Sequence, residues 1–342
     1  MMPLFGMRVG DWKVGFERWP GAWSELTRRV YLDPDCEGPF NVIVRWKSCN
    51  KRQLSFSERF RNRWEPDFMP TGLYREVYGM ARLTYQSECG LLLVELPDER
   101  TVDFEVIIDA ILQLLWFAAA ETGLVPFHTA GVSFDQHSVL LLGGSGSGKS
   151  TLCLMLTEMG LDFVCDDVVL LDSVRMVCGA GEYRISCRRR TAEMMNDLFP
   201  DRDWQRVLQE YPESDASRTM AQSKVLVDPC DISGTRWEKM SFPTLLVFPT
   251  LCESMSCDYL MEQLSSREAL RRLCQLSIAS PFQSSLKKAY FKSITGLVKR
   301  CRAVSLATNP DAGVQGLQAA AASLMTTIIE CSGENSTALV NA

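Results

Sequence analysis

The stretch that decides the fold reads FHTAGVSFDQHSVLLLGGSGSGKSTLCLMLTEMGLDFVCDDVVLLD and covers residues 127–172. Two apolar runs, Thr129–Phe134 and Ser138–Leu142, flank a short polar segment and predict a β-hairpin. Apolar residues then recur at helical spacing up to Gly160, which predicts a helix that stops at a glycine. A buried strand is expected over Phe163–Leu171. This alternation of strand, helix and strand predicts an α/β fold.

A glycine-rich loop connects the hairpin to the helix and fits the Walker A pattern GxxxxGK[ST]. Its glycines let backbone amides turn towards phosphate oxygens, and the start of the helix adds partial positive charge there. The pattern predicts that Lys149 contacts the β- and γ-phosphates and that the Ser150 hydroxyl is a ligand of Mg²⁺. We therefore expect ATP to bind to the P-loop residues Gly143, Gly144, Ser145, Gly146, Ser147, Gly148, Lys149, Ser150 and Thr151.

An acidic pair follows the loop unusually early. Asp166 and Asp167 close the apolar segment Leu161–Cys165 and come 17 and 18 positions after Lys149. This spacing leaves no room for the long insertions of motor, transporter or recombinase ATPases. One carboxylate can hold Mg²⁺ while the other accepts a proton from an incoming hydroxyl. Two solvated acids at an exposed strand end are the alternative interpretation.

Histidine is scarce, since the chain contains only His128 and His137. A histidine-rich metal site is thereby excluded, and Mg²⁺ held by oxygen atoms is the metal expected. His128 opens the strand that leads to the loop, where an ordinary core position is the alternative to a catalytic role. His137 is expected in the exposed turn of the hairpin.

Basic residues cluster in two places. The densest cationic run after the acidic pair consists of Arg184, Arg188, Arg189 and Arg190. Guanidinium groups suit phosphates and carboxylates, so the run could bind nucleotide phosphates or an acidic substrate, or form a solvated surface. Lys224 is a further candidate for steadying the transferring phosphoryl group. Residues 45–63, basic with interleaved aromatics, favour an amphipathic surface or a dock for an acidic peptide over a nucleic-acid site.

Composition bounds the remaining classes. The 342 residues are 46% hydrophobic and 23% charged, as in ordinary globular proteins of about two domains. The net charge of −6 makes a nucleic-acid partner unlikely, and the 13 cysteines without a CxxC pair favour a reducing compartment. The longest apolar stretch, Val106–Ala120, is shorter than the ~20 residues of a membrane span and predicts a core helix. With no signal-peptide pattern, we expect a cytoplasmic protein without membrane contact.

The histidine, the loop, the helix ending in glycine and the early Asp-Asp pair together resemble the catalytic domain of HPr kinase/phosphorylase and its bacterial serine-kinase relatives. Weaker similarity continues through LLVFP (245–249) and LSSREALRRL (264–273). The resemblance implies a P-loop kinase domain with an HPr kinase/PEP carboxykinase-like fold over residues 106–327. Short apolar strands predict a smaller, strand-rich α+β domain over residues 1–105, and residues 328–342 are expected to form a flexible tail.

The resemblance also implies roles for individual residues. Lys149 would contact the phosphates, and Ser150 and Asp166 would hold Mg²⁺. Asp167 would accept the proton of the attacking hydroxyl, and His128 would be an active-site residue.

Two family features are not found in this sequence. One is a magnesium-binding glutamate before an Arg-Gly signature, because Glu182 and Glu193 lie in the right region without the right neighbours. The other is the glycine-rich HPr-binding stretch, which is replaced by Tyr183–Arg190. We therefore expect an acceptor other than HPr.

The sequence thus predicts an ATP-dependent kinase that transfers the γ-phosphoryl group to a hydroxyl, with serine as the expected side chain. The acceptor could be a peptide, a protein or a small molecule, and a homo-oligomer is left open. One alternative is a small-metabolite kinase resembling adenylylsulfate kinase, whose loop is similar but whose following Asp-Gly-Asp run is missing here. The other is a non-catalytic regulatory module gated by nucleotide.

Overall fold

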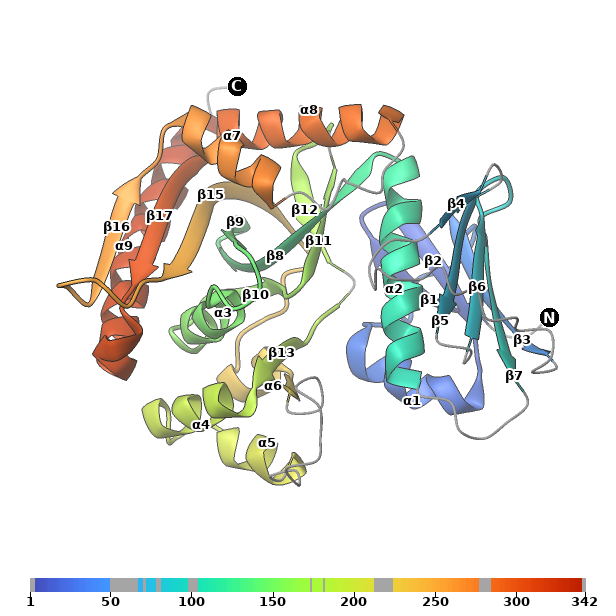
Figure 1. The fold of residues 1–342 in the computed structure, drawn as a ribbon, viewed down its shortest axis with the longest axis horizontal. Coiled ribbons are helices and arrows are strands. Elements are labelled where there is room, and N and C mark those ends of the chain that lie inside the picture. The colour runs from blue at the N-terminus through green and yellow to red at the C-terminus, as the bar shows by residue number, and fades with distance from the viewer. Residues whose placement is uncertain are drawn as a thin grey trace. The chain divides into compact units, whose positions relative to one another are not determined.

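The structure is a computed structural model. It describes residues 4–49, 67–69, 72–77, 81–97, 104–172, 174–180, 182–211, 224–276 and 284–339. Most of the basic stretch 45–63 lies outside these residues. The chain divides into two compact units, one formed by residues 1–126 and 279–288 and the other by residues 127–278 and 289–342 (Figure 1). Both contain helices and sheets, which confirms the predicted α/β class.

The first unit is built on a seven-stranded sheet with the order β1-β2-β3-β7-β6-β5-β4. The strands are β1 (Leu4–Val9), β2 (Trp12–Glu17), β3 (Val42–Cys49), β4 (Asp67–Met69), β5 (Gly72–Val77), β6 (Ala81–Gln86) and β7 (Leu91–Pro97). Helix α2 (Phe104–Glu121) packs against β5, β6 and helix α1 (Pro20–Arg29). Asp109 of α2 forms a salt bridge with Arg29 of α1. We expected this helix to open the second domain at residue 106. In the structure it belongs to the first unit, because its apolar face covers that unit's sheet.

The second unit is built on an eight-stranded mixed sheet with the order β10-β8-β11-β12-β15-β17-β16, and β9 pairs with both β8 and β15. The strands are β8 (Leu124–Phe134), β9 (His137–Leu142), β10 (Asp162–Cys165), β11 (Val168–Asp172), β12 (Val177–Gly179), β15 (Met240–Leu251), β16 (Tyr259–Gln263) and β17 (Arg302–Thr308). Strands β9, β15 and β17 are parallel, so their carboxyl ends meet at one edge of the sheet. Ligands of open α/β sheets bind at such an edge.

The predicted hairpin is confirmed, since β8 and β9 pair antiparallel. Its turn consists of Asp135 and Gln136, both with positive φ (48° and 64°), as a tight two-residue turn of the I′ type requires. His137 was expected in that turn, and this was wrong. It is the first residue of β9, only 6% exposed, because the two-residue turn leaves it inside the ladder.

Helices cover both faces of this sheet. On β15, Leu245 and Val247 belong to the core that includes α3 (Lys149–Glu158) and α9 (Gly313–Leu339). The alternating residues Leu246 and Phe248 point to the other face, where Arg272 of α7 (Ser266–Gln275) lies over the Phe248 ring. The long helix α8 (Ser284–Arg300) precedes β17. Burial on both faces explains why β15 reads as one continuous apolar run.

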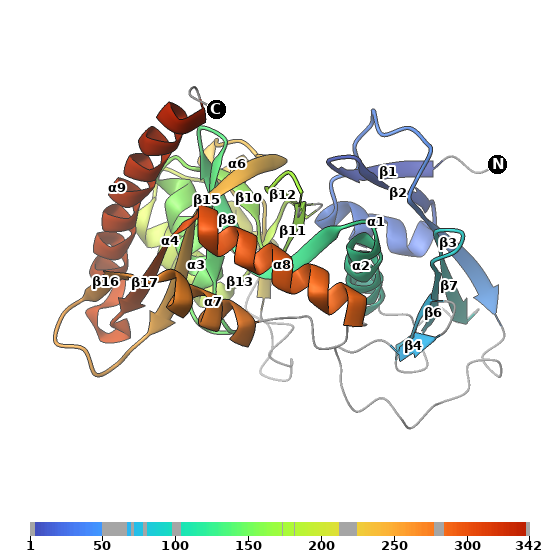
Figure 2. The same cartoon turned by 90° about the horizontal axis from the view of Figure 1, so that it is seen from above.

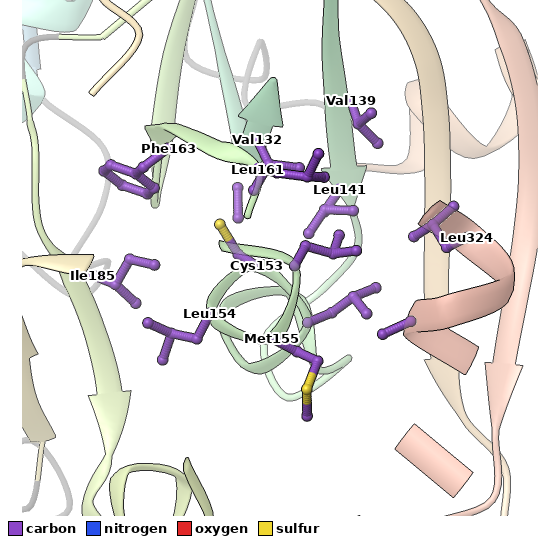
Figure 3. Close-up of a cluster of buried hydrophobic side chains, with 14 of the residues drawn as sticks. Val132, Val139, Leu141, Cys153, Leu154, Met155, Leu161, Phe163, Ile185 and Leu324 are labelled. Atoms are coloured by element: carbon purple, nitrogen blue, oxygen red, sulfur yellow. The ribbon is translucent and has the colours of Figure 1, made fainter. Parts of the chain in front are cut away.

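Figure 3 shows the centre of this core, with α3 seen end-on among side chains from several elements. Val132 and Val139 come from the hairpin, Leu324 comes from α9, and Ile185 comes from a separate strand on the opposite side. The labelled residues are between 0% and 1% exposed. Helix α3, which begins directly after the glycine-rich loop, is therefore held from all sides.

A small layer completes the second unit beside α3. It contains the two-stranded ribbon β13 (Ile185–Arg188) and β14 (Lys224–Val227), and helices α4 (Arg189–Leu198), α5 (Trp204–Glu210) and α6 (Pro229–Ser233). Trp204 is fully buried and donates from Nε1 to Glu158 Oε1 at 2.7 Å. Arg202 pairs with the same carboxylate at 3.3 Å, so the end of α3 anchors this layer.

The buried strand expected over Phe163–Leu171 is two strands. The chain leaves β10 after Cys165 and enters β11 at Val168, and Asp167 between them has a φ of 66°. β10 pairs with β8, and β11 pairs with β12. The apolar run concealed the break because both strands are buried.

The C-terminal residues also differ from expectation. We expected a flexible tail from residue 328. In the structure, α9 follows the short helix η3 (Pro310–Ala312) and continues to Leu339. Ile328, Cys331 and Ser332 of α9 are buried. Figure 2 shows α9 running along β16 and β17. By length and composition alone, one segment of the described chain, Pro310–Ser332, could cross a membrane; its mean hydropathy is 1.2 and it is 33% buried.

Two adjacent isoleucines of α9 test this packing. Ile328 is 1% exposed and Ile329 is 50% exposed. We expect Ile328→Ala to lower the free energy of unfolding by about 2–4 kcal/mol, because it removes buried methyl groups and leaves a cavity. Ile329→Ala, the matched control, should change it by no more than about 0.5 kcal/mol. Urea denaturation measures both, and equal effects would contradict the packing of α9.

Candidate functional site

The glycine-rich loop begins where β9 ends and closes at the first residue of α3. Gly146 and Gly148 have φ values of 81° and 92°, in the left-handed region that side chains disfavour. At Gly143 the constraint is space, since a Cβ would lie 2.4 Å from Ser147 Oγ. At Gly144 a Cβ would meet no atom within 4 Å. Glycine is therefore required for different reasons within the motif. Gly146 and Gly148 allow a left-handed backbone, and Gly143 leaves space for the Ser147 side chain.

The start of α3 can accept an anion. Its N-cap is Gly148, and no side chain caps the helix. The first-turn amides of a helix have no partners within the helix, and they carry partial positive charge. Lys149, which is 7% exposed, donates from Nζ to the carbonyl oxygens of Gly143 at 2.8 Å and Gly144 at 3.2 Å. The ammonium thus lies inside the curl of the loop.

The acidic pair lies beside this loop. Ser150 Oγ is 3.0 Å from Asp166 Oδ1 and 3.2 Å from Oδ2, which joins the first turn of α3 to the end of β10. Asp166 is 2% exposed, and the Ser186 N–H donates to its Oδ2 at 3.2 Å. A hydroxyl and a carboxylate from two separate motifs therefore meet at the mouth of the loop. These are two of the oxygen ligands that Mg²⁺ accepts together with phosphate oxygens.

The Asp166 carboxyl is electrostatically unusual. Burial, and then the adjacent Asp167 charge, raise its pKa from 3.8 to about 8, against the lowering by hydrogen bonds from Ser150, Ser186 and the Asp167 N–H. Desolvation of the charged form is the dominant cause. A buried carboxylate of this kind is stabilised when a cation binds to it.

Asp167 is held by its backbone. Its carbonyl oxygen accepts hydrogen bonds from His128 Nδ1 at 2.9 Å and from the Thr129 N–H at 3.1 Å. Because a carbonyl only accepts, the His128 proton is on Nδ1. Left-handed backbone at a non-glycine residue costs roughly 1 kcal/mol and persists where the surroundings fix it. His128 therefore positions Asp167 through the main chain.

Two neighbours of the site were missed in the sequence. One is Ser186, whose amide binds Asp166, and the other is Thr191 of α4, whose Oγ1 lies 3.4 Å from Thr151 Oγ1. The run from Arg184 to Arg188 alternates basic or polar with apolar residues, a pattern typical of a half-buried strand. That alternation could have revealed β13, although not its contact with Asp166.

Other candidates lie elsewhere or have other partners. Glu193 pairs with Arg189 at 2.9 Å, and Glu182 is 7% exposed. Lys224 is the first residue of β14, opposite Arg188, and its side chain lies outside the described residues. Among the described residues, no group of three or more His, Cys, Asp or Glu side chains forms a metal cluster.

Comparisons with known proteins add little to this geometry. Neither a protein-family model nor a curated protein sequence matches the chain. Among solved structures, the chain is similar to the HPr(Ser) kinase/phosphatase from Coxiella burnetii, at 12% identity and a TM-score of 0.32, over 63% of this chain and 97% of that chain. A likeness this distant carries no argument about function, which therefore rests on the site itself.

The two glycines at the start of the loop provide one test. Gly143→Ala places a methyl group 2.4 Å from Ser147 Oγ, whereas Gly144→Ala meets no atom within 4 Å. Overpacking of this kind costs about 1–3 kcal/mol, so we expect Gly143→Ala to weaken nucleotide binding roughly tenfold or more. Titration with a fluorescent ATP analogue measures this, with Gly144→Ala as the control. Equal affinities would contradict the loop geometry.

The buried acid provides a second test. The unfolded chain releases the Asp166 proton near pH 3.8 and the folded chain keeps it up to about pH 8, so stability falls as pH rises across that interval. Asp166→Asn removes this ionisation. Without metal or nucleotide, we expect the variant to gain stability over the wild type from about pH 4 to 8, by on the order of a few kcal/mol, and then to level off.

Urea denaturation at several pH values measures this difference, with the exposed Asp201→Asn as the matched control. A stability difference that is flat across this pH range would contradict the burial of a proton-holding carboxyl at position 166.

Proposed function

We propose that this chain is a P-loop phosphotransferase that binds ATP with Mg²⁺ and transfers the γ-phosphoryl group to a hydroxyl. One observation carries the proposal: Ser150 of the loop and Asp166 of the acidic pair are 3.0 Å apart. The hydroxyl of a phosphate loop and a nearby carboxylate are the protein ligands that P-loop enzymes use for Mg²⁺. On the same grounds we assign the second unit to an HPr kinase-like fold.

The residues present fit the metal. Mg²⁺ binds through one or two carboxylates and keeps further positions for water and phosphate oxygens. Asp166 offers a carboxylate whose pKa is raised mainly because burial removes water from its charged form, and Ser150 Oγ lies within reach of both its oxygens. Bound there, the cation would neutralise charge on the phosphates and orient them.

The protein's own groups account for the rest of the reaction. Loop amides and the start of α3 orient the triphosphate, and Lys149 exchanges its two loop carbonyls for phosphate oxygens. Phosphoryl transfer depends mainly on positioning and charge neutralisation. Such a small set of groups is therefore sufficient to orient the donor.

Asp167 is the proposed proton acceptor for the attacking hydroxyl. It is half-buried, next to the metal-binding carboxylate, and its main chain is fixed by His128 and Thr129. The two acids divide the work because their surroundings differ: Asp166 is enclosed and bonded to Ser150, whereas Asp167 is half-buried in a turn with left-handed backbone. A reaction that uses cellular ATP is consistent with a cytoplasmic location, which belongs to this proposal.

Asp167→Asn tests the assignment with little change of structure. Asparagine tolerates a left-handed backbone as well as aspartate does, so the substitution removes the carboxylate alone. We expect ATP binding to be nearly unchanged, whereas turnover falls by about 10²–10⁴-fold, the usual contribution of a general base. The measurement combines nucleotide titration with transfer of γ-labelled phosphate to acceptors in a lysate of the source organism.

Lys149→Ala serves as the control, because it should weaken the triphosphate contact itself and abolish labelling. The size of the labelled species distinguishes protein, peptide and metabolite acceptors. Undiminished labelling by Asp167→Asn would remove Asp167 from the reaction. ATP binding without transfer to any acceptor would support a nucleotide-gated regulator instead.

A further inference from the structure

The cationic run after the acidic pair separates into two kinds of arginine. Arg189 is structural: it pairs with Glu193 at 2.9 Å and also donates to the carbonyl oxygens of Leu208 and Tyr211. It thereby holds α4 to the end of α5. The side chains of Arg184, Arg188 and Arg190 form no hydrogen bond or salt bridge with any residue that the structure describes.

The outer face of the ribbon carries Arg188. Ile185 and Cys187 of β13 are 0% and 3% exposed and pack into the core with Val225 and Val227 of β14. Residues along a strand alternate between its faces. Ser186 and Arg188 therefore lie on the outer face, and Arg188 is exposed. We call this the outer ribbon face and extend it to Arg184, two positions before Ser186.

This face begins at the proposed reaction centre. The Ser186 N–H donates to Asp166 Oδ2 at 3.2 Å, and Thr191 Oγ1 of α4 lies 3.4 Å from Thr151 Oγ1 of the loop. Along the chain, Arg188 lies two residues after Ser186, and Arg190 directly precedes Thr191. A group bound by these arginines therefore lies next to the mouth of the phosphate loop.

One arginine is left incompletely satisfied. Arg184 Nε is buried and has no hydrogen-bond partner among the residues that the structure describes. The Asp228 carboxylate interacts electrostatically with this guanidinium, but its Oδ1 caps α6 by accepting from the Cys230 N–H at 3.1 Å and the Asp231 N–H at 3.3 Å. The Arg184 guanidinium also lies over the Tyr183 ring, 5.1 Å from its centroid.

We propose that the outer ribbon face, with Arg184 and Arg188, and Arg190 at the start of α4 bind an acidic peptide segment that carries the acceptor hydroxyl. The assignment of the hydroxyl rests on the proposed function. Arg184 and Arg188 are four residues apart, an even separation that matches the alternation of side chains along an extended peptide, and Arg190 follows two residues later. Guanidinium groups bind carboxylates with matched geometry.

Charge favours an acceptor over the nucleotide as the ligand. The triphosphate already has the loop amides, the start of α3 and Lys149, so it does not require three further cations. The chain as a whole carries a net charge of −6, which repels acidic peptides everywhere except at such a local basic surface. Arginines that form no salt bridge with the described residues, concentrated beside the loop, therefore select an acidic segment and its position.

Fluorescence anisotropy of labelled peptides tests this on the full chain. One peptide has glutamates at alternate positions on both sides of a single serine, and a second has glutamine in their place. We expect the wild type to bind the glutamate peptide roughly tenfold more tightly at low salt, as charge pairs with two exposed arginines and the partly buried Arg184 allow, and to lose this preference at high salt.

The variant Arg184→Gln/Arg188→Gln/Arg190→Gln should bind both peptides equally, with unchanged affinity for a fluorescent ATP analogue. Arg188→Gln/Arg190→Gln, which leaves the partly buried Arg184 in place, should lose most of the preference and guards against misfolding of the triple variant. Arg271→Gln is the matched control, since it removes one exposed arginine of α7 and leaves Glu268 paired with Arg272 at 3.0 Å.

Equal binding of the two peptides by the wild type, or an unchanged preference in the double variant, would overturn the proposal. A loss of ATP affinity as large as the loss of peptide affinity would assign the arginines to the triphosphate instead. If the wild type prefers the acidic peptide but binds no ATP, the peptide-binding proposal stands and the proposed kinase function is wrong. The two ideas can thus fail separately.

Discussion

The hydrogen bond between Ser150 and Asp166 is the contact on which the rest of the site depends. It joins α3, which follows the phosphate loop, to the turn where β10 ends, and it does so inside the protein, where Asp166 is 2% exposed. When a carboxylate is buried without a cation beside it, the loss of water destabilises its charged form. Burial therefore raises the pKa of Asp166, and a cation bound beside it would stabilise the charged carboxylate.

The backbone around Asp167 explains how two adjacent acids come to differ. A continuous strand would place neighbouring side chains on opposite faces of the sheet, one of them in the core. The chain instead leaves β10, takes a φ of 66° at Asp167 and enters β11, and the two hydrogen bonds to the Asp167 carbonyl fix this turn. Asp166 stays enclosed against Ser150, whereas Asp167 is only half-buried.

Local patterns made the hairpin, the loop and α3 predictable, because their signals lie within a few residues of each other. The break at Asp166 and Asp167 was not predictable, since an apolar run reads alike whether it forms one buried strand or two. The contacts of Ser186 with Asp166 and of Thr191 with Thr151 join residues 20 and 40 positions apart, and no local pattern reports them. The end of α9 was missed because residues 333–337 read Gly-Glu-Asn-Ser-Thr, which are mostly weak helix formers.

The small layer of β13, β14, α4 and α5 is fixed to α3 along its whole length. Thr191 contacts Thr151 at its start, Ile185 faces Leu154 near its middle, and Trp204 and Arg202 hold Glu158 at its end (Figure 3). Because α3 also carries the phosphate loop, the position of the outer ribbon face relative to the loop is set by packing. A basic surface held in this way can fix where a bound segment lies as well as attract it, which is the requirement that phosphoryl transfer places on its acceptor.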